Sequence, residues 1–235
     1  MIKLNRKSKK LLLLQRNELL TETQKWLRKK FGRFLFTNLL INYFQNKKLE
    51  KNTESLFLTE IETFKKYLPH STKNIMDIGC GLGIINIYLN SIYKKKTSFF
   101  LLDKNRIDKK IKYGFSSNYE SYNDLSETKN LLLNNEFNLE QINLFDVEKT
   151  IYIEEKIDIV ISLKSMGYHY PFELYLKLFN ICCDENTLFI FDLSKVYFDH
   201  NELQKYFKKI QVIYQEDSIH PLRRVICSGF KSENN

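Results

Sequence analysis

The sequence predicts an α/β fold centred on a seven-stranded, mostly parallel sheet. From residue 73 onward, short apolar runs alternate with amphipathic segments, which is typical of parallel strands joined by helical crossovers. The last two apolar runs, 210–214 and 224–230, follow each other without a helix between them, and they predict an antiparallel pair at one edge. The first seventy residues have a helical pattern and predict a cap on this sheet.

Composition sets limits on the class of protein. The chain has 235 residues, of which 43% are hydrophobic and 28% charged, so it can bury a core without disulfides or metal. No apolar run approaches the ~20 residues of a membrane-spanning helix, and Leu11–Leu14 is too short for a signal-peptide core. We therefore expect a cytoplasmic protein. The four cysteines form no C-x-x-C pair, so we expect no metal site and buried free thiols at Cys182 and Cys183.

The N-terminal part is predicted to be helical over residues 8–68, because its apolar side chains recur at spacings of three and four. Gly32 weakens the middle of the first stretch, and a second helix is predicted over Ser55–Leu68, ended by Pro69. The residues expected on the apolar face of the first stretch are Leu12, Leu13, Leu19, Leu20, Trp26, Leu27, Phe31, Phe34 and Leu35. We expect residues 1–70 to form a basic helical extension and residues 71–235 to form the sheet domain.

Seven strands and four helices are predicted within the sheet domain. The predicted strands are 74–78, 98–102, 141–145, 157–163, 187–191, 210–214 and 224–230. The predicted helices are 82–93, 122–135, 172–183 and 201–209. The run 157–163 is nearly all apolar, as expected for a strand that is buried on both faces.

The positive charge is concentrated in the N-terminal fifth of the chain. The net charge is +9, but residues 1–51 carry 14 Lys and Arg against three Glu, which leaves the remainder slightly acidic. A basic helical arm of this kind can contact RNA, an anionic lipid surface or a phosphorylated substrate. It can equally be a solvated helix face. Lysine greatly outnumbers arginine, which weakens the case for nucleic acid.

The strongest chemical motif is the glycine-rich turn Asp77-Ile78-Gly79-Cys80-Gly81-Leu82-Gly83, which follows a predicted strand and opens a helix. Glycines allow positive φ and close approach of a ligand to the backbone. The N-terminus of the helix attracts a carboxylate or a phosphate. Asp103 ends the second strand, where an acid can bind both hydroxyls of a ribose. The pattern therefore predicts a nucleotide-type cofactor.

The spacing within this turn distinguishes between families. A dinucleotide-binding turn that begins at Gly79 requires a glycine at position 84, where this chain has Ile84, and no G-K-[ST] follows for a P-loop. The acid followed by G-x-G-x-G resembles the first motif of class I S-adenosylmethionine-dependent methyltransferases. The resemblance covers residues 71–235 and implies the Rossmann-like fold of that family.

The resemblance also implies roles for individual residues, with S-adenosylmethionine as cofactor and S-adenosylhomocysteine as product. The glycines of the turn would line the methionine part of the cofactor. Asp77 would order the loop and meet the cofactor amino group, and Asp103 would bind the ribose. Asp146, after the third strand, would reach the adenine amine, although an aspartate there is also typical of a turn cap. The expected cofactor-binding residues are Asp77, Gly79, Cys80, Gly81, Gly83, Asp103, Lys104, Asp146, Val147 and Ser162.

The segment after the fourth strand, Ser162–Pro171, is expected to hold the methyl acceptor. His169 is the histidine of this segment, and its ordinary pKa near neutrality suits a general base that deprotonates a hydroxyl. The same histidine can instead line the pocket or bond to backbone. Tyr168 and Tyr170 can stack on an acceptor or hydrogen-bond to it. The residues expected to contact the acceptor are Tyr168, Tyr170, Lys164 and Tyr113.

Two segments carry a finer resemblance. They are Ile111–Phe115 with Tyr122–Leu125, and Ser162–Pro171 leading into Glu173–Leu176. Together they resemble a group of bacterial sugar O-methyltransferases. Tyr113 then lies where a pocket wall or lid is expected, although aromatic residues at such spacing are also typical of a core.

The sequence therefore predicts a methyltransferase that acts on a hydroxyl of a small molecule or sugar, as a monomer or homodimer. One alternative is an RNA or protein methyltransferase that holds its polymer with the basic arm. Against it, the D/N/S-P-P-Y signature of amino-methylating enzymes is absent, and His169-Tyr170-Pro171-Phe172 is only distantly similar. The other alternative is a protein that binds S-adenosylmethionine without catalysis.

Overall fold

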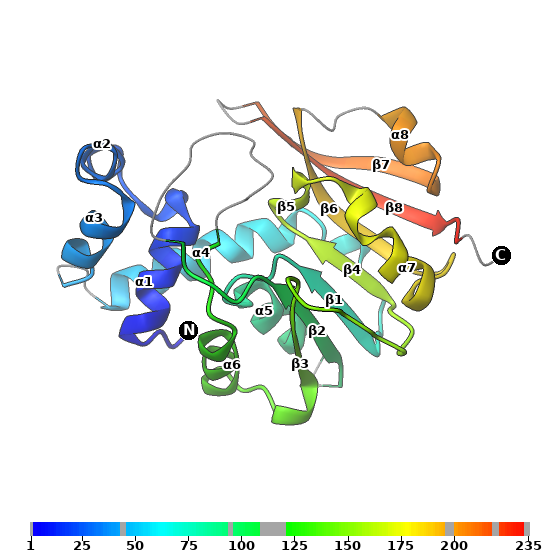
Figure 1. Cartoon of the computed structure of the whole chain (residues 1–235), viewed down its shortest axis with the longest axis horizontal. Coiled ribbons are helices and arrows are strands. Elements are labelled where there is room, and N and C mark those ends of the chain that lie inside the picture. Colours follow the sequence, from blue (N-terminus) through cyan, green and yellow to red (C-terminus); the bar gives the residue numbers. More distant parts are fainter. Residues whose placement is uncertain are drawn as a thin grey trace.

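The computed structural model describes residues 2–42, 46–93, 96–108, 121–195, 200–217 and 221–232. Its centre is a seven-stranded sheet in the order β3-β2-β1-β4-β6-β8-β7 (Figure 1). The strands of the sheet are β1 Asn74–Ile78, β2 Ser98–Asp103, β3 Ile142–Asp146, β4 Ile159–Ser162, β6 Leu188–Ser194, β7 Phe207–Glu216 and β8 Leu222–Phe230.

The direction of the strands agrees with the prediction from the sequence. The pairs β1–β2, β2–β3, β1–β4 and β4–β6 are parallel. Strand β8 is antiparallel to both β6 and β7, between which it lies. The predicted seven-stranded, mostly parallel sheet with an antiparallel edge pair is therefore confirmed.

Successive side chains of each central strand enter two different cores. Ile75, Phe99 and Ile161 pack on one face of the sheet, whereas Met76, Phe100 and Val160 pack on the other. The first face is covered by α5 Ile84–Ile92 and α6 Leu125–Asn134, and the second by α7 Leu176–Cys182 and α8 His200–Gln204 (Figure 1). This alternation follows from the two-residue period of a strand and makes a three-layer molecule.

The N-terminal part is helical, as predicted, but its helices are shorter and begin elsewhere. They are α1 Arg6–Gln15, α2 Glu22–Phe31, α3 Arg33–Leu40 and α4 Asn46–Glu62. The predicted break at Gly32 is present, since Gly32 has a φ of +82° between α2 and α3. The predicted helix Ser55–Leu68 is wrong at both ends. Helix α4 starts earlier and stops at Glu62, and Lys65–Tyr67 forms only a 3-10 turn before Pro69.

The apolar face predicted for the first stretch is only partly buried. Leu12, Leu13, Leu19 and Leu20 lie in the core, but Trp26, Phe31 and Leu35 are each more than half exposed. The reason is their place in the fold. Helix α1 packs against α6, whereas α2 and α3 lie outside α1 and are the outermost helices (Figure 1).

Two further predictions are corrected by the structure. No strand was predicted between 157–163 and 187–191, but Ser165–Tyr170 forms an extra strand, β5, which contacts β6 outside the seven-stranded sheet. The predicted helix 201–209 is shorter, because α8 ends at Gln204 and β7 already begins at Phe207. All four cysteines are free and buried, as expected for Cys182 and Cys183.

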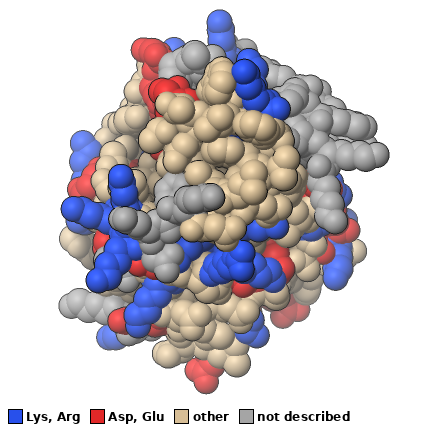
Figure 2. All heavy atoms as spheres, turned by 90° about the vertical axis from the view of Figure 1, so that its left-hand side faces the viewer, with Lys and Arg blue, Asp and Glu red and all other residues tan. Residues whose placement is uncertain are grey.

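The side of the molecule formed by the N-terminal helices is basic. Figure 2 shows Lys and Arg side chains around a broad area of uncharged residues, with fewer acidic side chains among them. Within the described part of the chain, no helix is long and apolar enough to cross a membrane.

Candidate functional site

The glycine turn links the carboxyl end of β1 to the start of α5. Gly79, Gly81 and Gly83 have φ of +74°, +54° and +70°, a region that other residues rarely adopt. The backbone N–H groups of Gly79 and Cys80 both donate to the carbonyl of Leu102 on β2, over 2.7 and 3.2 Å. A Cβ atom on Gly79 would lie 2.1 Å from Oγ of Ser165 on β5, so the turn fits tightly between two strands.

Asp103, at the end of β2, fixes the middle of this turn. Its Oδ2 accepts from the N–H of Gly81 over 2.7 Å, and its Oδ1 accepts from the N–H of Lys104 over 2.7 Å. The carbonyl of the same residue, Gly81, accepts from Asn123 Nδ2 at 2.9 Å and from Thr128 Oγ1 at 2.8 Å. The two residues that the sequence linked, Gly81 and Asp103, are therefore brought together.

Asp77 lies beneath the turn rather than at its surface. The side chain is 3% exposed, and its Oδ2 accepts from Asn86 Nδ2 on α5 over 2.6 Å. Burial raises the pKa of Asp77 to about 7, although the bond from Asn86 opposes this. Burial also raises the pKa of Asp103 to about 6, against the bonds from Gly81 and Lys104. Both carboxyls can thus gain or lose a proton close to neutral pH.

Cys80 lies within the turn, and its thiol donates a weak hydrogen bond to the turn itself. The residue is buried, and its thiol lies 3.5 Å from the carbonyl of Gly81. Burial raises the pKa of this thiol, with nearby Asp103 and Asp77 adding to the effect. The thiol is therefore neutral at physiological pH.

Residues at the ends of β2 and β3 form one wall beside Asp103. The N–H of Val147 donates to the carbonyl of Asp103 over 3.0 Å. Asp146 accepts at its Oδ1 from the N–H of Glu148 at 3.1 Å, a bond typical of a turn cap, and from Asn105 at 3.4 Å. Next to this wall lies an open hollow of about 370 Å³. Its lining residues are Asn105, Arg106, Ile107, Asn123 and Asp124.

Ser162 and Lys104, which were both predicted to contact the cofactor, differ in their exposure to solvent. The hydroxyl of Ser162 is fully buried, donates to the carbonyl of Ile78 at 2.8 Å and accepts from the N–H of Met166 at 2.9 Å. It ties β4 to β1 and β5, so its predicted contact with the cofactor stays a prediction. Lys104 is partly exposed, and its Nζ lies 5.5 Å from the centre of the Tyr170 ring.

The predicted acceptor residues lie on β5. Tyr168 and Tyr170 are half-buried, and His169 between them is exposed. The rings of Tyr168 and His169 meet edge to face, with 4.8 Å between their centres. Tyr170 reaches toward the β2 end through its contact with Lys104. Tyr113 lies outside the described residues.

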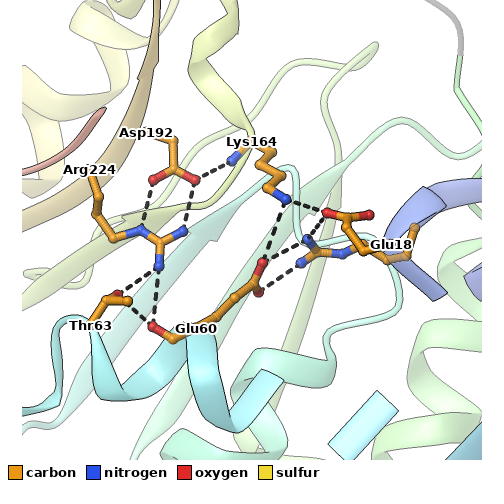
Figure 3. Close-up of polar contacts among 7 residues, drawn as sticks. Glu18, Glu60, Thr63, Lys164, Asp192 and Arg224 are labelled. Carbon is orange, nitrogen blue, oxygen red and sulfur yellow. Dashed lines mark hydrogen bonds and ion pairs between the residues drawn. The ribbon is translucent and has the colours of Figure 1, made fainter. Parts of the chain in front are cut away.

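A network of charged side chains joins the N-terminal helices to the end of β4 (Figure 3). Both guanidinium nitrogens of Arg16 donate to the Glu60 carboxylate on α4, over 2.9 and 3.0 Å. Lys164 follows β4, pairs with Glu18, and has its Nζ 3.9 Å from Glu60. Lys164 has a φ of +58°, so its backbone is strained. Burial opposes the charge of Glu18, but Lys164 and Arg16 lower its pKa overall.

The network continues into the antiparallel part of the sheet. Arg224 on β8 makes a two-pronged ion pair with Asp192 on β6, over 2.7 and 3.0 Å, and both side chains are almost fully buried. Asp192 also accepts from the backbone N–H of Lys164 over 3.0 Å. Arg224 donates to Thr63 Oγ1 at 2.8 Å, at the end of α4. The predicted acceptor residue Lys164 is thus held at its backbone by Asp192 and at its side chain by Glu18 and Glu60 (Figure 3).

Sequence reasoning missed the residues that reach the turn from other elements. Gln15, at the end of α1, lies against the turn, since a Cβ atom on Gly81 would be 2.8 Å from its Oε1. Its amide donates to the carbonyl of Tyr122 over 2.9 Å. Asn123 and Thr128 were also missed. No local signal marks these residues, because their contacts span 107, 42 and 47 positions of sequence. Within the described part of the chain, no group of acids, histidines and cysteines is arranged to hold a metal ion.

Comparisons with known proteins support the fold. No protein-family model and no curated protein sequence matches the chain. Among solved structures, the 16S rRNA N2 G1207 methyltransferase of T. thermophilus, in complex with AdoMet and guanosine, superimposes with a TM-score of 0.51. It is 11% identical, and the match covers 74% of this chain and 42% of that one. The ribosomal protein L11 methylase of Lactobacillus delbrueckii has a TM-score of 0.47 at 14% identity, covering 72% and 76% of the two chains.

The likeness to the T. thermophilus structure is a likeness of fold, and the strand order of the sheet belongs to the same fold. The chain therefore has the Rossmann-like fold of the class I S-adenosylmethionine-dependent methyltransferases.

Proposed function

We propose that this protein is a methyltransferase that uses S-adenosylmethionine and transfers the methyl group to a hydroxyl of a small molecule or sugar. One observation carries the proposal. The three glycines of the turn all have positive φ, and the central one is bonded to the carboxylate of Asp103 at the end of the adjacent strand. This joins the two parts of a nucleoside-binding site at the carboxyl edge of a parallel sheet, where ligands of such folds bind.

The residues present fit the chemistry of this cofactor. Gly83 is the N-cap residue of α5 and offers no side chain to cap the helix, so the N–H groups of the first turn suit a carboxylate. Beneath the turn, Asn86 Oδ1 is buried and has no hydrogen-bond partner among the described residues, and its amide nitrogen bonds to the carboxyl of Asp77. These acceptors suit the amino group of the methionine part, and Asp103 suits the ribose hydroxyls. When bound, the cofactor supplies a methyl group that its sulfonium makes electrophilic.

The chain's own contribution would be alignment and proton removal. An activated methyl group needs the acceptor held in line with it and water kept away. Gln15 and the segment after it would cover the turn from the N-terminal side, and Tyr168 and Tyr170 would hold the acceptor. His169 lies between these tyrosines and would take the proton of the acceptor hydroxyl.

The cofactor site is tested by calorimetric titration with S-adenosylhomocysteine. We expect Asp103→Ala to weaken binding at least tenfold, which is about 1.4 kcal/mol. The matched control is Glu140→Ala, since Glu140 is an exposed acid in the turn before β3, at the opposite end of the strands. An affinity that the control leaves unchanged and Asp103→Ala lowers supports the site. Absence of binding by a folded wild-type protein contradicts the proposed function.

The role of His169 is tested by replacing each of two exposed histidines. Once an acceptor is identified by screening sugars and other hydroxyl compounds, His169→Ala should lower kcat by about 10²- to 10⁴-fold. Binding of S-adenosylhomocysteine should stay within about twofold of wild type. His70→Ala is the control, since His70 lies before β1, away from the carboxyl edge. Full activity of His169→Ala contradicts a base at this position.

The alternatives give different results in the same assays. An RNA or protein methyltransferase would transfer methyl groups to a polymer and would lose that activity when the N-terminal lysines are neutralised. A binding protein without catalysis would take up S-adenosylhomocysteine with the same dependence on Asp103 and transfer no methyl group to any acceptor.

A further inference from the structure

The outer helices α2 and α3 expose apolar side chains that no other part of the described chain covers. Trp26 and Phe31 on α2 are 53% and 55% exposed, and Leu35 and Leu39 on α3 are 55% and 54% exposed. Leu35 and Leu39 are four residues apart, so they share one face of α3. We call these four residues together the α2–α3 face. Helices α2 and α3 contact each other, so these side chains come from neighbouring helices.

Lysines accompany these apolar residues. Lys29 and Lys30 are exposed at the end of α2, and the Nζ of Lys30 lies 4.1 Å above the ring of Trp26. Lys25 is on the same helix and pairs with Glu22. The two arginines nearby are used within the fold. Arg28 is buried against the carbonyls that end α1, and Arg33 stacks on Tyr122.

We propose that the α2–α3 face docks on an anionic lipid surface. Short helices with Trp, Phe and Leu on one side and lysines around them lie in the plane of a membrane interface, with the apolar side chains among the acyl chains. Lysine stems extend so that the amines reach the headgroups. The positive charge of residues 1–51 then adds attraction to anionic lipids.

The side chains favour lipid over nucleic acid. Aromatic rings can stack on bases, but Leu35 and Leu39 are aliphatic and gain most from an apolar medium. The exposed cations beside the face are lysines, whereas the recognition of bases favours the planar guanidinium of arginine. RNA is therefore an outcome that the test must exclude.

Vesicles of phosphatidylcholine with and without phosphatidylglycerol provide the test, with the full chain. Trp26 is the single tryptophan of the protein, so its emission reports directly from the proposed contact. We expect a blue shift and co-sedimentation with the anionic vesicles, both weakened by salt, and neither with neutral vesicles. Binding to neutral vesicles with equal affinity, or no binding to either, overturns the proposal.

Paired variants identify the surface. Leu35→Ser with Leu39→Ser, and separately Lys29→Glu with Lys30→Glu, should each lower the vesicle partition coefficient about tenfold or more. The matched controls lie elsewhere on the surface and should change it less than twofold. They are Leu139→Ser with Leu174→Ser for the first pair, and Lys156→Glu with Lys177→Glu for the second.

Circular dichroism confirms that each variant is folded before its binding is compared. A parallel titration with mixed-sequence single-stranded RNA separates the competing partner. If RNA binds, depends on Lys29 and Lys30, and vesicles do not bind, the surface is for nucleic acid and the proposal is wrong. Controls that lose vesicle binding as strongly as the α2–α3 variants overturn it as well.

Discussion

Asp77 and Asp103 both lie at the glycine turn in surroundings that oppose their charge. Burial raises their pKa values to about 7 and about 6, and the hydrogen bonds that each accepts only partly offset this. Carboxylates kept in such places are typical of binding sites, where a ligand favours the charged form. The buried negative charge that would suit Asp77 to a cationic group therefore lowers the stability of the ligand-free protein at neutral and higher pH.

Replacing Asp77 with Asn should stabilise the ligand-free protein at about pH 8 and do so much less at about pH 5. The folded-state pKa of about 7 lies above the ordinary value of 3.8, so the folded chain holds this proton more tightly than the unfolded chain. The resulting stabilisation is complete below about pH 4 and is lost as the pH rises to about 7. Above that pH the buried charge costs up to roughly 4 kcal/mol, which neutral Asn avoids.

Urea unfolding of wild type and Asp77→Asn at the two pH values measures this difference. Glu140→Gln, at an exposed acid, serves as the control and should change the free energy of unfolding by less than about 0.5 kcal/mol at either pH. An equal effect of Asp77→Asn at both pH values would mean that the charge of Asp77 does not limit stability. The same variant should bind S-adenosylhomocysteine more weakly than wild type, since it cannot carry the negative charge.

The part of the site that could be predicted is local in sequence. The glycine turn has its own signature, and Asp103 follows at a spacing that the βαβ unit imposes. Gln15 could not be predicted, because its contact with the turn depends on how α1 packs against α6. The ion pairs of Lys164 are also contacts between distant segments, as its partner Glu18 lies 146 positions away.

At the scale of elements, the central strands were predictable because apolar runs buried on both faces differ from their surroundings. Strand β5 was not predicted, because its sequence contains Gly167 and is followed directly by Pro171, and both residue types are typical of loops. The helical period of residues 8–35 correctly predicted buried positions only in its first part, at Leu12, Leu13, Leu19 and Leu20. The spacing of apolar residues along a helix does not predict which element covers them. Trp26, Phe31 and Leu35 stay exposed among the described residues.

The pair of Arg16 and Glu60 links helix α4 to the end of α1, in addition to the apolar contacts of α4 with the core. The side chains are only 14% and 10% exposed, so both charged groups are largely removed from water and face each other. Arg16→Met or Glu60→Met alone should lower the free energy of unfolding by about 3 kcal/mol, because each leaves a charge buried without its main partner. The double variant should lose at least about 1 kcal/mol less than the sum of the single losses.

Urea unfolding of the four proteins in this cycle gives the coupling energy. The exposed pair of Lys205 and Glu202, with side chains 60% and 57% exposed, is the matched control. Its coupling should be below about 0.5 kcal/mol. Additive losses at Arg16 and Glu60 would show that the pair does not hold α4 in place.

At the scale of the whole molecule, the N-terminal helices and the sheet share one core. Leu12 and Leu13 of α1 and Phe57 and Ile61 of α4 belong to the same buried cluster as Ile75 on β1. The division at residue 70 proposed from the sequence follows the change from helices to strands. The continuous core nevertheless leads us to infer that the two parts unfold together, even though most of the positive charge lies on the first part.

Two natural reporters can test this cooperation, because they lie in different parts of the chain. The single tryptophan, Trp26, is in the helical part, and all four cysteines are buried in the sheet part. In a urea titration, Trp26 emission and thiol accessibility should give the same midpoint.

Leu13→Ala, at a fully buried position of α1, should lower both midpoints by the same amount, equivalent to about 3 kcal/mol. The exposed Leu133→Ala on α6 is the control and should change neither by more than about 0.5 kcal/mol. If Leu13→Ala shifts only the tryptophan transition, the helices form an independent unit, and the cap over the glycine turn can open without unfolding the sheet.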